Sequence, residues 1–193
     1  MPETRTLDPT VLTGRRSALF GLLLVSTLAS PSTAFATPQI GAHDVQTLFF
    51  VSKSDDRNRV DYGIHLDEAC LPVGRAPVFA YWRRFEPGDE PLGSLNTLDE
   101  QIYGIRHQAV RTTAPNGSWV EMRINGLPDE RILVLIQRMP DGCRARAHTT
   151  LSGRPVYLRR VHAELATLVG IDHLLLHGVD RRTGAAVRER RDP

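Results

Sequence analysis

Turn signals recur through the second half of the chain and leave room only for short strands between them. They are Pro115-Asn116-Gly117, Asn125-Gly126, Asp141-Gly142, Ser152-Gly153 and Thr183-Gly184. Asn-Gly and Asp-Gly steps tolerate the positive φ that tight hairpin turns require. Short strands separated by turn signals about every ten residues are typical of β-sandwiches and β-barrels. The pattern therefore predicts an all-β, mainly antiparallel sandwich or barrel.

Apolar and alternating runs between the turns mark the expected strands. They are Leu48–Val51, Val60–Leu66, Val78–Trp82, Ile105–Arg111, Trp119–Ile124, Arg131–Met139, Cys143–Leu151, Val156–Leu165, His173–Gly178 and Ala186–Arg190. Val60–Leu66 alternates, which predicts a half-buried strand with Asp61 and His65 on its open face. Val78–Trp82 is apolar on both faces, which predicts a central strand.

Two further runs, Ile132–Ile136 and Leu174–Leu176, are also apolar on both faces. In an antiparallel sheet this predicts either cover on both sides or an apolar interior large enough for a ligand. One short helix is expected near residues 97–103, with Asn96 or Thr97 as its N-cap and Gly104 at its end.

The first 36 residues have the pattern of a signal peptide. Arg15 and Arg16 precede an apolar run, Ala18–Ala29, and Ala34 and Ala36 form an A-x-A site, which predicts cleavage between Ala36 and Thr37. The run is too short for a permanent membrane anchor, which needs about 20 apolar residues. We expect an exported protein, periplasmic or secreted, by the general secretory route in preference to the twin-arginine route. Residues 37–193 are expected to form a single β-rich domain.

The chain has two cysteines, Cys70 and Cys143. Their separation matches no zinc or redox motif, and an even number of cysteines in an oxidising compartment favours one disulfide. Two separate buried thiols are the alternative.

Charge and motifs exclude several classes of function. The chain has 24 Lys and Arg against 22 Asp and Glu, so its net charge of +2 indicates no nucleic-acid partner. We find no phosphate loop, nucleophile elbow or zinc-protease motif. His162 and Glu164 are near each other in a predicted strand but have no evident third ligand, so no metal and no cofactor are expected. A set of serine, histidine and aspartate could be drawn from any of several serines, but a chain of this size supplies such sets by chance, and no catalytic residue is predicted. These serines are Ser52, Ser54, Ser94, Ser118 and Ser152.

The run from Phe49 to Tyr62, with the letters FFVSKSDDRNRVDY, resembles the opening motif of a bacterial domain-of-unknown-function family, number 4833. In that motif a strand with a basic residue and serine leads into an asparagine-rich turn and a second strand. Lys53 stands where arginine is more usual, and Asp56 where the first asparagine is expected. The resemblance continues at Tyr81-Trp82 and at Tyr103-Gly104. It implies an exported β-rich domain and no particular reaction.

The turn from Lys53 to Asn58 is the sharpest candidate for a binding site, because exposed loops on a rigid scaffold often carry function. The candidate residues for ligand or partner binding are Lys53, Ser54, Asp56, Asn58, Trp82 and Tyr103. The alternatives are an Asx turn that satisfies its own backbone, and aromatic residues that belong to the core.

The sequence favours a non-enzymatic binding or interaction domain of the cell envelope, whose partner is an apolar small molecule or an envelope protein. An envelope hydrolase that acts on glycan or ester, and a structural or assembly protein, remain as alternatives. Titratable groups that converge in a pocket would favour the enzyme. An apolar cavity with a few polar groups at its mouth would favour the binding domain.

Overall fold

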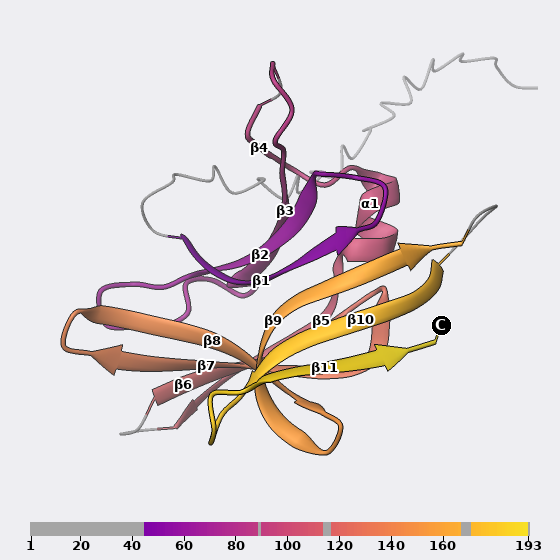
Figure 1. Ribbon diagram of the computed structural model, residues 1–193. Helices are drawn as coiled ribbons and strands as arrows, with labels where there is room; N and C mark the ends of the chain where they lie inside the picture. Colours follow the sequence, from indigo (N-terminus) through magenta and orange to yellow (C-terminus); the bar gives the residue numbers. More distant parts are fainter. Residues whose placement is uncertain (1–44, 89, 114–116, 167–170, 193) are drawn as a thin grey trace, which may run out of the picture. The chain divides into compact units, whose positions relative to one another are not determined.

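The computed structural model describes residues 45–88, 90–113, 117–166 and 171–192 (Figure 1). Within these ranges the chain is mostly strand with a single short helix, which confirms the predicted fold class. The elements are β1 (Val45–Lys53), β2 (Arg59–His65), β3 (Val78–Arg83), β4 (Leu92–Gly93), α1 (Thr97–Tyr103), β5 (Ile105–Thr113), β6 (Gly117–Ile124), β7 (Leu127–Met139), β8 (Gly142–Leu151), β9 (Arg154–Leu165), β10 (Ile171–Asp180) and β11 (Ala186–Arg191). The expected leader, its Ala36–Thr37 cleavage site and the Pro115-Asn116 turn lie outside the described residues.

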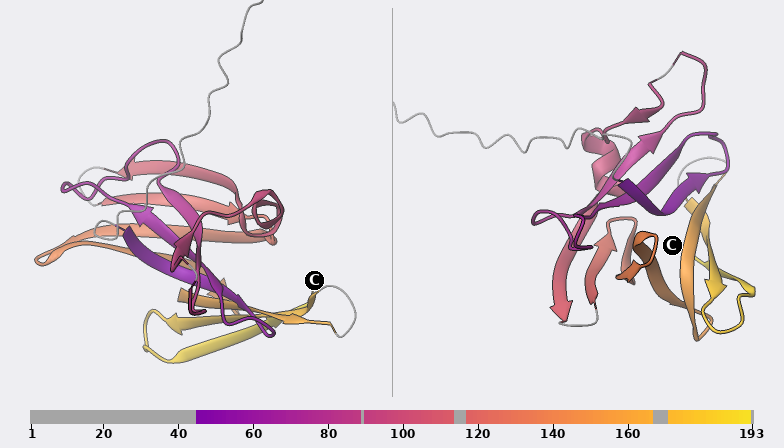
Figure 2. Two further views of the ribbon diagram at one scale, coloured as in Figure 1. Left: turned by 90° about the horizontal axis from the view of Figure 1, so that it is seen from above. Right: turned by 90° about the vertical axis from the view of Figure 1, so that its left-hand side faces the viewer.

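All the strands belong to one sheet, in the order β4-β3-β2-β1-β9-β8-β7-β6-β5, with β10 and β11 added beside β9. Among the described strands, β1 and β9 are the one parallel pair, and the other pairs are antiparallel. The first part of β9 pairs with β8, and its later part, Arg160–Ala163, pairs with β1. In both views of Figure 2, β10 and β11 form a layer separate from β5 and β6. The change of partner along β9 therefore separates the sheet into two layers.

One side chain joins β3 to β5, which lies at the far end of the sheet. The side-chain amide of Gln108 on β5 accepts from the backbone N–H of Val78 on β3 and donates to its carbonyl, both at 3.2 Å. The Gln108 amide thus makes the two hydrogen bonds to the Val78 backbone that a neighbouring strand would otherwise make. The sheet is bent enough to bring these two strands together.

Asp61 corrects the prediction that β2 is half-buried. Its side chain is 0% exposed, because the guanidinium groups of Arg59 and Arg83 cover it and donate to its two oxygens at 2.7 and 2.6 Å. Gly63 on the same strand is also buried, and a Cβ there would lie 2.6 Å from Val45. Side chains from both neighbouring strands thus close over the face that the alternation predicted to be open.

The three strands that the sequence predicted to be apolar on both faces, β3, β7 and β10, are buried less completely than their sequences suggest. β3 is not central, since its outer neighbour β4 has only two residues, Leu92–Gly93. In β7 and β10 the inward residues are buried, whereas Leu133, Leu135 and Leu175 on the other face are half-buried. The second apolar face of β7 and β10 is therefore only partly covered.

The disulfide joins Cys70, in the loop after β2, to Cys143 at the start of β8, with a Cα–Cα distance of 5.3 Å. This links two strands that are not neighbours in the sheet. The structure therefore pairs the two cysteines in the way that the sequence favoured.

Candidate functional site

A cavity of about 670 Å³ opens at the end of the molecule where β1 and β9 end and β10 begins. The β6–β7 turn and α1 complete its wall. Most of its lining is aliphatic, namely Val51, Ile102, Ile124, Leu127, Val161, Ala163, Leu165, Ala166, Ile171 and Leu174. Its volume and its apolar wall are typical of small-molecule sites.

The parallel pairing of β1 with β9 decides which residues face the cavity. Val51 lies beside Val161, and Lys53 lies beside Ala163. Successive side chains of a strand point to opposite faces, so Ser52 and His162 face away from the cavity. The small side chain of Ala163 leaves free volume next to the Lys53 stem.

The β6–β7 turn holds α1 against the cavity. Asn125 donates from its side-chain amide to the Glu100 carbonyl at 2.7 Å, and the backbone N–H of Gly126 donates to the Ile102 carbonyl at 2.7 Å. The Ile102 carbonyl lies in the last turn, where carbonyls lack a partner within the helix, and the Glu100 carbonyl takes the Asn125 bond in addition to the one from the backbone N–H of Gly104. A Cβ at position 126 would lie 3.0 Å from the Ile102 oxygen, so glycine permits this close approach. At the other end of α1, Asn96 is the N-cap and accepts from the backbone N–H groups of Leu98 and Asp99.

Tyr103 stands at the rim of the cavity and is held from behind. The Trp82 ring packs edge-to-face on Tyr103 with 5.7 Å between the ring centroids. The indole N–H of Trp82 donates to Asp99 at 2.8 Å, which ties this contact to α1. Trp82 therefore supports a wall of the cavity and is not itself among the residues that line it.

The polar groups of the cavity gather at the turn after β1. The Lys53 ammonium lies 3.5 Å from a carboxylate oxygen of Asp56 and 3.9 Å from one of Asp55. The Ser54 hydroxyl accepts from the backbone N–H of Leu165 at 3.2 Å and so joins the ends of β1 and β9. The mouth thus combines one cation, two carboxylates and a hydroxyl beside an apolar interior.

The phenol of Tyr103 stays protonated at the mouth. Burial raises the pKa of this group, the Lys53 ammonium acts in the opposite direction, and the charges of Asp99, Asp56 and Asp55 raise it further. A protonated phenol both donates and accepts hydrogen bonds. Tyr103 therefore places an uncharged polar side chain among the residues that line the cavity.

The six predicted binding residues divide into two groups. Lys53, Ser54 and Tyr103 line the cavity. Asp56, Asn58 and Trp82 support it from outside. Asp56 pairs with Lys53 and also accepts from the backbone N–H of Asn58 at 2.8 Å, while the Asn58 side chain accepts from the backbone N–H of Phe85 at 3.0 Å. The Asx turn that the sequence left open as an alternative is thus present beside the cavity.

The sequence did not indicate the aliphatic part of the cavity. Its members come from the β6–β7 turn, the end of β9 and the start of β10, which are far apart along the chain. In the sequence they look like ordinary strand residues. A faint signal is the pair of small residues Ala163, near the end of β9, and Ala166, just after it, among larger aliphatic residues.

A second group of polar residues lies on the other face of β1 and β9. The Ser52 hydroxyl is 2.9 Å from Nδ1 of His162, and Nε2 of His162 is 3.1 Å from Glu164. The Arg160 guanidinium contacts both the Ser52 hydroxyl, at 2.9 Å, and the same Nδ1, at 2.8 Å. Because arginine only donates, Nδ1 accepts and the ring proton is on Nε2, toward Glu164. The group resembles a serine-histidine-acid set, but Arg160 competes with Ser52 for the single lone pair of Nδ1.

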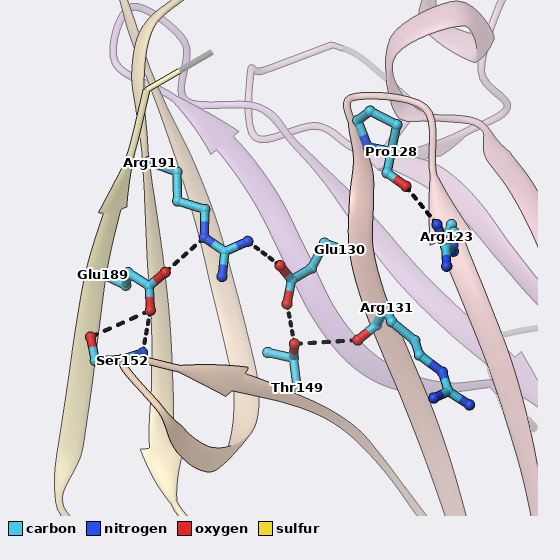
Figure 3. Close-up of polar contacts among 8 residues, drawn as sticks. All are labelled: Arg123, Pro128, Glu130, Arg131, Thr149, Ser152, Glu189 and Arg191. Carbon is cyan, nitrogen blue, oxygen red and sulfur yellow. Dashed lines mark hydrogen bonds and ion pairs between the residues drawn. The ribbon is translucent and has the colours of Figure 1, made fainter.

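A second cavity, of about 660 Å³, has a charged lining between the β7–β8 hairpin and β11. Figure 3 shows its main network, in which Glu130 contacts both Arg191 and Thr149, and Glu189 contacts Arg191. Glu130 is only 5% exposed. Since these charges satisfy one another, the network serves to hold β11 against β7 and β8.

Among the described residues, no group of three or more histidine, cysteine or acidic side chains is placed to hold a metal ion. No helix in those ranges combines the length and the hydropathy that crossing a bilayer requires.

The family model described as "Domain of unknown function (DUF4833)" matches residues 49–190. The match begins at the strand that leads into the Lys53 turn and ends in β11, so it includes every element that builds the apolar cavity. No curated protein and no solved structure matches the chain.

Proposed function

The chain belongs to the DUF4833 family, and we propose that it is a non-enzymatic binding domain that holds an apolar small molecule in the cavity beside Lys53. The observation that carries this proposal is the cavity itself, about 670 Å³ with a mainly aliphatic wall. Each ligand methylene moved from water into such a wall contributes about 0.8 kcal/mol. The polar groups at one rim give the ligand an orientation.

The alternative of an ester or glycan hydrolase has weaker support. Ser52, His162 and Glu164 come together, but they face away from the cavity, and Arg160 takes up the acceptor site of the imidazole. We therefore expect no reaction of Ser52 with a fluorophosphonate probe. A labelled Ser52 in intact-mass and peptide analysis would support the hydrolase instead. A structural or assembly role is favoured if the cavity binds nothing.

We further propose that the domain works outside the cytoplasm. The Cys70–Cys143 disulfide supports this, because disulfides persist in oxidising compartments. The leader pattern of residues 1–36 points the same way. N-terminal sequencing of protein from the periplasmic or culture fraction is expected to begin at Thr37. An intact Met1 in that fraction would contradict the proposed cleavage.

A chain-length series of 1-alkanols that displace an apolar dye tests the binding function. Affinity is expected to rise about fourfold for each added CH₂ and to level off when the cavity is full. Adsorption to the outer surface has no such plateau. A series without saturable binding would overturn the proposal.

A matched pair of variants locates the binding in this cavity. Ala163→Leu adds bulk to the cavity wall, and Ala109→Leu makes the same change on β5, away from the cavity. The first is expected to move the plateau to shorter alkanols, and the second to leave it unchanged. Equal behaviour of the two variants would show that the dye binds elsewhere.

A further inference from the structure

The mouth of the apolar cavity carries an excess of negative charge. Lys53 is the chain's only lysine, and it is the one cation among the described residues that line this cavity. Its ammonium is within 4.0 Å of two carboxylates, Asp55 and Asp56, so these three groups together carry one negative charge. Asp99, whose carboxylate accepts from the Trp82 indole, adds a further negative charge that acts on the Tyr103 phenol.

From this arrangement we propose that the cavity takes a single-chain amphiphile with a cationic amine head group and discriminates against a carboxylate head group. The inference rests on the proposed function of the cavity, since it assigns the chemistry of the ligand's polar end. The apolar chain lies among the aliphatic side chains, and the head group lies beside Asp55 and Tyr103.

Lys53 is a poor receptor for an anionic ligand despite its position. Both carboxylates already contact its ammonium, so a ligand carboxylate has to displace one of them or stand as a third anion beside them. Like charges at this distance repel.

An ammonium head group finds acceptors that are still free. The Asp55 side chain is 61% exposed, and its contact with Lys53 is long, at 3.9 Å. An ionised carboxylate has about four acceptor positions, so Asp55 can receive a ligand N–H without leaving Lys53. The phenol oxygen of Tyr103, on the same rim, is a second acceptor.

The size of the preference follows from the excess charge. One net charge about 6 Å from the head group, in a water-filled mouth, changes affinity roughly threefold. Changing the head group from carboxylate to ammonium reverses the sign and so spans roughly tenfold at low ionic strength. Added salt reduces this ratio because the mouth is open to solvent.

Three ligands with the same chain and different head groups test the inference: dodecylamine, 1-dodecanol and dodecanoate. Each displaces an apolar dye from the purified protein at low salt and neutral pH, below its micelle concentration. Dodecylamine is expected to bind most tightly and dodecanoate most weakly, about tenfold apart. Dodecanoate binding as tightly as dodecylamine overturns the inference and leaves the cavity function standing. Failure of all three ligands to saturate overturns the cavity function itself.

Charge variants separate the mouth from the overall charge of the protein. Asp55→Asn is expected to reduce the amine-to-carboxylate ratio about tenfold, since it removes one negative charge at the mouth. Asp141→Asn is the matched control, because Asp141 is 75% exposed in the β7–β8 turn and does not line the cavity. An equal change in both variants would mean that net charge, not the mouth, sets the ratio, and it would overturn the inference.

Discussion

The phenol of Tyr62 donates a 2.7 Å hydrogen bond to the backbone carbonyl of Tyr103 and so joins β2 to the end of α1. Tyr62 is fully buried and stacks on Phe49 with 4.5 Å between the ring centroids. Burial raises the pKa of Tyr62, so its hydroxyl stays protonated and remains a donor. The core of the sheet therefore sets the position of the residue at the cavity rim.

Removing this hydroxyl is expected to weaken both folding and binding. Tyr62→Phe leaves the Tyr103 carbonyl without this donor and should lower the free energy of unfolding by about 1–2 kcal/mol. Alkanol affinity should fall as well, because Tyr103 loses an anchor. Urea denaturation and dye displacement measure the two effects. Tyr157→Phe, at a half-buried tyrosine away from the apolar cavity, is the control, and equal losses in both variants would contradict this account.

The local features of the fold could be predicted because short-range chemistry sets them. Asn96 caps α1 with its own side chain, within three residues. Ser152 and Gly153 have φ values of 48° and 72° and form the two-residue turn between β8 and β9 that their positions in the sequence indicated. Turns and caps of this kind determined where most of the strands and the helix begin and end.

The cavity could not be predicted because distant pairings create it. Ser54 and Leu165 are hydrogen-bonded although they are 111 residues apart in the sequence, and no local pattern predicts that β1 lies parallel to β9. Asp61 illustrates the same limit, since alternation assigned it to solvent, whereas Arg59 of its own strand and Arg83 of the neighbouring β3 bury it. The Lys53 turn was recognised from its own polar residues, whereas its aliphatic partners were not.

The disulfide is expected to contribute strongly to stability. Cys70 and Cys143 are 73 residues apart, and closing a loop of that length stabilises by roughly 4 kcal/mol in the chain-entropy model. Reduction should therefore lower the melting temperature by about 8–16 °C for a domain of this size. Calorimetry with and without reductant measures the shift. Two thiols that react with an alkylating agent in the unreduced native protein would contradict the bridge.

The buried carboxylate of Glu130 is expected to matter more than an exposed one. Glu130 contacts Arg191 and Thr149 and is 5% exposed, so Glu130→Ala removes one partner from each, leaving Arg191 with Glu189 and Thr149 with the Arg131 carbonyl. Losing a charge-assisted contact of this kind costs about 1.5–3 kcal/mol. Glu121→Ala removes the more open pair with Arg131 and should cost at most about 1 kcal/mol. Urea denaturation of the two variants makes the comparison, and similar losses would mean that the network does not hold β11.

His148 is expected to make the fold less stable in acid. Its side chain is 7% exposed, its ring packs edge-to-face on Tyr157, and its buried Nδ1 has no hydrogen-bond partner among the described residues. Burial, with smaller contributions from Arg181 and Arg146, lowers the pKa of His148 from 6.5 to about 4. The imidazole therefore stays neutral in the folded protein at pH values where it is already protonated in the unfolded chain.

The sign of the pH effect follows from this difference. Between pH 6.5 and about 4 the unfolded chain binds the extra proton, so stability falls as the pH falls through this window. The loss of stability approaches roughly 3 kcal/mol at the acid end, at 1.36 kcal/mol for each pKa unit.

The loss is measured from the unfolding free energies of the wild type and of His148→Phe at pH 7.5 and at pH 4.5. The contributions of the other titrating groups cancel when the free energies of the two proteins are subtracted. The difference in unfolding free energy between the variant and the wild type should change by about 2–3 kcal/mol in favour of the variant when the pH falls from 7.5 to 4.5. If this difference does not change with pH, then His148 takes up a proton as readily in the folded protein as in the unfolded chain.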